Sequence, residues 1–132
     1  MSMSSPRGAE AYRRIEAESR SPMELVIMLY DGALRFVGEA RDATVRKDLA
    51  ARGAAVTRVL AIVGELQSTL NVKDGGAVAG ELDRLYSYVT SRLIDVTAKQ
   101  DAKALDEVHK LLSTLRDAWV QLASTPAGTA QP

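Results

Sequence analysis

Apolar residues recur at steps of three and four along four long segments of this chain, and short polar breaks separate the segments. This spacing places an apolar stripe along one side of an α-helix. The segments cover residues 21–46, 49–71, 78–99 and 101–122. Apart from brief ambiguous pieces, no stretch of strand length alternates between polar and apolar residues. The pattern therefore predicts an all-α protein.

Local signals mark where three helices begin and where one break lies. Ser21 followed by Glu24 is typical of a capping box, in which each side chain bonds the backbone N–H of the other residue. Asp48 and Asp101 are the predicted N-caps of the second and fourth helices. Residues 71–77 (NVKDGGA) are predicted to form a loop because they contain a Gly-Gly pair.

Helices of about 20 residues are ~30 Å long, and short breaks between them favour antiparallel neighbours. We therefore predict an antiparallel up-down four-helix bundle with a short extra N-terminal helix at residues 9–18. Residues 9–123 would form the single domain, and residues 1–8 and 124–132, which are small, polar and rich in Pro or Gly, would be disordered. A long dimeric coiled coil is the alternative, but the breaks interrupt the pattern before many heptads accumulate.

The expected core of this bundle consists of one stripe from each helix. The stripes are Leu25, Leu29, Gly32, Phe36 and Ala40; Val56, Val59, Val63, Leu66 and Leu70; Leu82, Leu85, Val89, Leu93 and Val96; and Leu105, Val108, Leu112, Leu115, Trp119 and Leu122.

The composition argues against catalysis and against nucleic-acid binding. The 17 basic and 17 acidic residues cancel, so the basic footprint of a nucleic-acid-binding protein is missing. There is no cysteine, and the single histidine, His109, has only Asp106 beside it at helical spacing. A di-iron bundle needs carboxylates in its core stripes, and these stripes hold none. We expect no catalytic residue, no metal site and no cofactor.

The sequence also predicts a cytoplasmic protein without stable membrane insertion. The longest apolar run has six residues, whereas about 18 are needed to span a bilayer. The polar N-terminus, Met1 to Ala9, lacks the apolar centre of a signal peptide.

That six-residue run, Leu25 to Tyr30, goes right round a helix, which is wider than one bundle seam requires. On a helical wheel Val37 lies on the flank of the first stripe. Ile27, Tyr30 and Leu34 lie further round. We take these four residues as candidates for binding a partner.

The second helix carries an additional stripe made only of small residues: Ala50, Ala54, Thr57, Ala61, Gly64 and Ser68. Two interpretations stay open. The stripe is either a close internal packing surface or an alanine-rich solvent face, or it is a shallow groove that receives a helix from a partner. Under the second interpretation Ala54, Ala61 and Gly64 are binding candidates.

The stretch "SPMELVIMLYDGAL" resembles the signature of the flagellin export chaperone family (FliS). The resemblance continues with Tyr12 in "AYRR", "KD" at 47–48, "LYSYVTSRL" at 85–93 and "DEVHKLLSTLRDAW" at 106–119. It covers roughly residues 11–122 in order. Thr97 departs from the asparagine expected in the family, late in the third helix.

The resemblance implies the same four-helix bundle and a function. Family members bind the disordered C-terminal segment of flagellin in the cytosol, prevent its premature polymerisation and hand it to the gate of the flagellar type III export apparatus. The free chain would be a monomer or a weak dimer. The N-terminal segment with Tyr12 and Ile15 would lie over the empty groove and contribute to binding. The alternative is a non-catalytic structural bundle whose extra apolar arc forms a homodimer interface.

Overall fold

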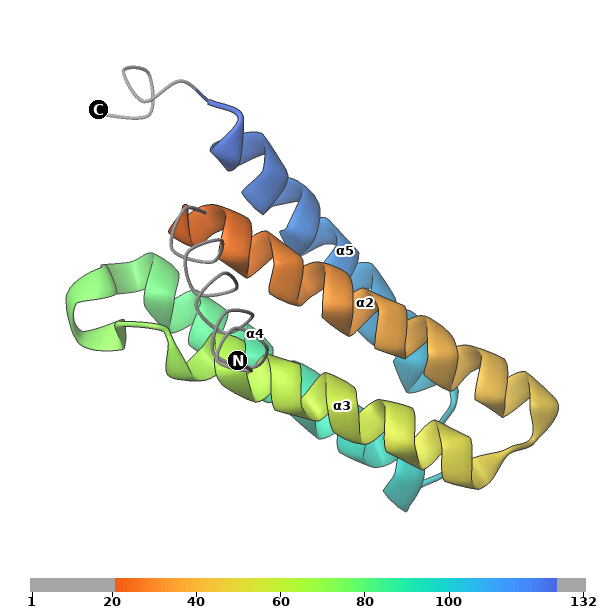
Figure 1. The fold of residues 1–132 in the computed structure, drawn as a ribbon. Helices are drawn as coiled ribbons and strands as arrows, with labels where there is room; N and C mark the ends of the chain where they lie inside the picture. Colours follow the sequence, from red (N-terminus) through yellow and green to blue (C-terminus); the bar gives the residue numbers. More distant parts are fainter. Residues whose placement is uncertain (1–20, 126–132) are drawn as a thin grey trace, which may run out of the picture.

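The computed structural model describes residues 21–125, apart from the side chains of residues 72–74, and these residues form four helices (Figure 1). They are α2 (Pro22–Arg46), α3 (Leu49–Ser68), α4 (Val72–Ala98) and α5 (Lys103–Ala123). α2 packs against α3 and α5, and α4 packs against the same two helices, which closes a ring of four. The all-α prediction is confirmed for the described residues. The helix predicted at 9–18 lies outside them.

Two of the predicted helix starts are confirmed by their hydrogen bonds. The backbone N–H of Glu24 donates to Ser21 Oγ over 3.1 Å, and the backbone N–H of Ser21 donates to Glu24 Oε1 over 2.9 Å. At α3 the backbone N–H of Ala51 donates to Asp48 Oδ1 over 3.0 Å. Both caps satisfy N–H groups that the first turn of a helix leaves unpaired.

The predicted start of α5 is wrong. The residue before the helix is Ala102, and its side chain makes no capping hydrogen bond. The Asp101 carboxylate lies 3.3 Å from Arg92 Nη2 of α4 instead. The carboxylate therefore links two helices rather than capping one. The end of α3 also differs, since this helix stops at Ser68 and not at residue 71.

The loop predicted at 71–77 is wrong for most of its length, since the break after α3 lies at residues 69–71. α4 is helical from Val72, and only Gly76 interrupts it, with φ 67° and ψ −148°. Residues that have a Cβ rarely adopt this backbone conformation, which explains why a glycine is found here. A short helical piece therefore precedes the break, and the regular part of α4 follows Gly76 much as predicted.

The core draws on all four helices, and most predicted stripe residues of α3, α4 and α5 belong to it. The buried ones are Val56, Val59, Val63, Leu66, Val89, Leu93, Val96, Leu105, Val108 and Leu112. Stripe residues in the C-terminal half of α5, such as Leu115 and Trp119, are half-buried. Leu122 is 48% exposed, because the last turns of α5 project beyond α2 (Figure 1).

The predicted core stripe of α2 is displaced from the real one, except at Ala40, which is buried as predicted. The buried residues of α2 are Tyr30, Ala33, Val37, Ala40 and Ala43. Leu25 is 38% exposed, and Leu29, Gly32 and Phe36 are half-buried. The predicted stripe follows the larger side chains of α2, but several positions of this stripe border α3. A Cβ on Gly32, for example, would lie 3.4 Å from Ile62 of α3.

A buried pair of tyrosines crosses the core. The hydroxyl oxygens of Tyr30 and Tyr86 are 2.6 Å apart, and both side chains are almost fully buried. Burial raises the pKa of both phenols, because it disfavours the charged form. α2 and α4 are not neighbours in the ring, so this hydrogen bond ties opposite helices together.

Arg92 joins α4 to the start of α5. Its guanidinium lies 2.7 Å from Glu107, 2.9 Å from Asp95 and 3.3 Å from Asp101. The Tyr88 hydroxyl donates to the other oxygen of Glu107 over 2.6 Å. These hydrogen bonds, from Tyr88 and then from Arg92, hold the pKa of Glu107 below its ordinary value.

Acid should therefore weaken the contact between α4 and α5. A carboxyl group whose pKa is lower in the folded chain stabilises the fold at pH values above its pKa in the unfolded chain, which is about 4.3. This stabilising contribution is lost as the pH falls through the pKa of the group in the folded chain. We expect the Tm of the wild-type protein to fall more steeply below about pH 4.5 than that of Glu107→Gln. Thermal melts from pH 7 to 3 test this, and parallel curves for the two proteins would contradict it.

Candidate functional site

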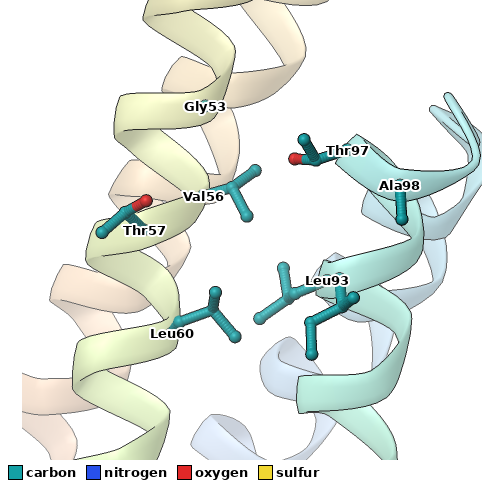
Figure 2. A pocket seen from close by; sticks show the side chains of 8 residues that line it. Gly53, Val56, Thr57, Leu60, Leu93, Thr97 and Ala98 are labelled. Carbon is teal, nitrogen blue, oxygen red and sulfur yellow. The ribbon is translucent and has the colours of Figure 1, made fainter.

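A groove lies between α3 and α4 on the outside of the bundle, with a volume of about 420 Å³ (Figure 2). Its lining residues, which define the α3–α4 groove, are Gly53, Val56, Thr57, Leu60, Leu93, Ile94, Thr97 and Ala98. Buried Val56 and Leu93 belong to the core below it, and Ile94 is 51% exposed. Small residues on both helices keep the groove open. Its chemistry suits an apolar side chain or helix face.

The small-residue stripe of α3 faces outward. Ala54, Ala61 and Gly64 are all exposed, and a Cβ built on Gly64 would meet no atom within 4 Å. This settles the orientation that the sequence left open and excludes close packing inside the bundle. Thr57 belongs both to the stripe and to the α3–α4 groove, so the two surfaces are continuous.

A second hollow, of about 640 Å³, lies between the first turns of α2 and the end of α3. Its lining, which defines the α2–α3 hollow, consists of Pro22, Leu25, Val26, Met28, Leu29, Glu65 and Thr69. Leu25 and Met28 are 38% and 49% exposed. α3 contributes to both depressions from opposite flanks, and its small-residue stripe runs between them.

The candidates predicted on α2 do not form an exposed arc. Tyr30 and Val37 are 0% exposed, so their placement outside the core is wrong. Ile27 and Leu34 are half-buried, and Leu34 packs against the core. The reason is that α2 has α3 on one flank and α5 on the other, and together they cover most of its circumference. On the α5 side, the Asp31 carboxylate accepts a hydrogen bond from Arg116 over 2.8 Å.

The remaining predicted candidates separate into two groups. Ala54, Ala61 and Gly64 lie on the exposed face of α3, which fits both a groove and an alanine-rich solvent face, and they line neither depression. Tyr12 and Ile15 lie outside the described residues. The structure adds Leu60 and Ile94, which the sequence analysis did not select. Each directly follows a core-stripe residue, Val59 or Leu93, and that adjacency was the only sign of them in the sequence.

Within residues 21–125, leaving aside the side chains of residues 72–74, no three side chains of His, Cys, Asp or Glu come together as a metal site would require. None of the helices in this part of the chain is long and apolar enough to cross a membrane.

Comparisons with known proteins point to one family. The family model described as "Flagellar protein FliS" matches residues 5–126. The "Flagellar secretion chaperone FliS" of Salmonella typhimurium is 35% identical over 121 residues, which cover 88% of this chain and 90% of that protein. The "Flagellar secretion chaperone FliSB" of Pseudomonas aeruginosa is 31% identical over 117 residues, covering 86% and 93%. The similarity thus extends over the whole described bundle.

Proposed function

The chain belongs to the FliS family of flagellar proteins, and on this premise we propose that it is a flagellar secretion chaperone that acts in the cytoplasm. Its proposed cargo is the C-terminal segment of flagellin, called the cargo segment below. The chain would keep this segment unpolymerised and hand it to the gate of the flagellar type III export apparatus. The single observation that most supports this is an exposed face of α3 with an apolar depression on each side.

The two depressions suit an amphipathic segment that folds as it binds. An apolar helix face in the α3–α4 groove would contact Leu60 and Ile94. A second part of the segment would fill the α2–α3 hollow beside Leu25 and Met28. Between them it would cross α3 at Ala61 and Gly64, whose small size lets another backbone come close. A disordered segment that wraps a surface in this way makes a large contact area, but the cost of ordering the segment keeps the affinity moderate.

We propose a regulatory part for the segment with Tyr12 and Ile15. The chain enters α2 at Ser21, directly beside Pro22 and Leu25 of the α2–α3 hollow. The preceding residues are therefore tethered next to an apolar depression. In the free chain they would cover this hollow, and the cargo segment would displace them.

Co-purification tests the proposed function directly. The chain should form a 1:1 complex with full-length flagellin, and this complex should be lost with flagellin that lacks its C-terminal segment. Mass measurement in solution distinguishes the alternative. A tight homodimer that binds neither form of flagellin would contradict the proposal and favour a structural role.

A further inference from the structure

Among the described residues, Arg52 of α3 is a buried charge that has no carboxylate partner. The residue is only 5% exposed. Its Nη2 donates to Gln100 Oε1 over 2.7 Å, while the Nε–H has no partner among the described residues. A guanidinium taken out of water without a carboxylate is unfavourable, and an unpaired buried donor calls for an explanation. By contrast, Arg92 and Arg116 are each paired with carboxylates.

Arg52 is adjacent to residues at one end of the α3–α4 groove, although its own side chain is not part of the lining. Arg52 directly precedes Gly53 and is one turn before Val56, and both of these residues line the groove. Its hydrogen-bond partner Gln100 follows Ala98, the last groove residue of α4. Figure 2 shows Gly53, Thr97 and Ala98 together at this end, with Leu60 further along α3. The Arg52–Gln100 bond therefore bridges the two helices where the groove ends.

Gln100 does not neutralise this charge, because it is a neutral amide. Its Nε2 donates to the Thr97 carbonyl oxygen over 3.4 Å, which orients its own oxygen toward Arg52. The end of the groove thus holds a guanidinium that is bonded only to the neutral amide of an exposed residue. Because its unpaired Nε–H is itself buried, an incoming carboxylate would take the place of Gln100 at Nη2. A carboxylate is the group that a guanidinium binds most strongly, often through two parallel hydrogen bonds.

The undescribed ends of this chain are poor sources of that carboxylate. Arg52 lies near the start of α3, so about 30 Å of helix separates it from Ser21. Glu16 and Glu18 are at most five residues from Ser21 and reach about 18 Å. Glu10 would reach about 40 Å only in a fully extended chain. Residues 126–132 contain no acidic side chain.

We propose that Arg52 receives a carboxylate of the cargo segment, next to the apolar residues that fill the α3–α4 groove. This inference rests on the proposed function and assigns the cargo a register. The groove runs eight residues along α3 from Arg52 to Leu60, or about 12 Å. The acidic residue should therefore lie about two helical turns from the cargo residue that contacts Leu60.

Arg52→Met tests the inference from the side of the chaperone. The substitution keeps an unbranched apolar side chain in place of the arginine stem and removes the charge, so the Tm should hold or rise. The Kd for the cargo segment, measured by calorimetry, should increase at least tenfold. Arg58→Met is the matched control, because Arg58 is exposed on the same helix and stacks on Phe36, 5.3 Å from its ring centre. This control should bind like the wild type.

The cargo tests the same contact without changing the chaperone. Each Asp and Glu of the cargo segment is replaced singly by Asn or Gln. One replacement should weaken binding about tenfold, and Arg52→Met should abolish that difference. If no replacement costs affinity, or if Arg52→Met binds like the wild type, the inference is wrong although flagellin binding stands. Absence of any flagellin binding would reject the proposed function itself.

Discussion

Tyr30→Ala should lower the free energy of unfolding by roughly 3–5 kcal/mol, the largest loss expected from one substitution in this chain. Tyr30 is 0% exposed at the centre of the core. Its removal leaves a cavity and takes the partner from the Tyr86 hydroxyl, which is 2.6 Å away. Against a typical total of about 5–15 kcal/mol, the variant should be partly unfolded at ambient temperature. Urea denaturation followed by circular dichroism measures the loss.

Two companion variants separate the cavity from the hydrogen bond. Tyr30→Phe keeps the ring but leaves a buried hydroxyl unpaired, at a cost of about 1–3 kcal/mol. Adding Tyr86→Phe removes that hydroxyl and should recover part of the loss. Phe36→Ala should cost less than Tyr30→Ala, because the structure places Phe36 only half inside. The assignment of the core fails if Tyr30→Ala unfolds at the same urea concentration as the wild type.

The double variant Thr57→Asp, Ile94→Asp should weaken binding of the cargo segment at least a hundredfold. The two residues belong to opposite walls of the α3–α4 groove, and both are exposed in the free chain. In the complex each carboxylate would be desolvated against apolar groups without a partner. A loss of about 1.4 kcal/mol at each site already gives two decades in Kd.

Val45→Asp serves as the control, since Val45 is 82% exposed and lies near the end of α2, outside this groove. It should bind the cargo segment like the wild type. Surface substitutions usually change stability by no more than about 0.5 kcal/mol, so the double variant and the Val45→Asp control should both remain folded. Unchanged affinity in the double variant would exclude the α3–α4 groove as a binding site.

Much of the fold was predictable because it depends on local sequence. The Ser21–Glu24 capping box and the Asp48 cap involve residues three apart, and the structure forms both. Each of α3, α4 and α5 carries one apolar stripe, and the residues in the middle of that stripe are buried as predicted. Asp101 shows the limit of local reasoning. Its partner Arg92 is nine residues away on another helix, and no capping rule takes that contact into account.

The candidate site was less predictable, for a related reason. The sequence identified the small-residue stripe of α3 but not its direction, because small residues suit both a close helix contact and an open face. The α3–α4 groove combines residues about 40 positions apart, such as Leu60 and Thr97. No pattern within one helix shows such a pairing. The family, in contrast, was recognisable from the sequence, since its signature is a contiguous stretch.

The sequence by itself therefore determined four helices, their main start signals and the family to which the chain belongs. Helical period and capping act within a few residues, so they can be read along the chain. Only the tertiary structure decided which face of α2 is covered, because that depends on two neighbouring helices at once. The same is true of the Tyr30–Tyr86 pair, the outward stripe of α3 and the unpaired charge of Arg52. Each of these arises where side chains from different helices meet, or fail to meet, in space.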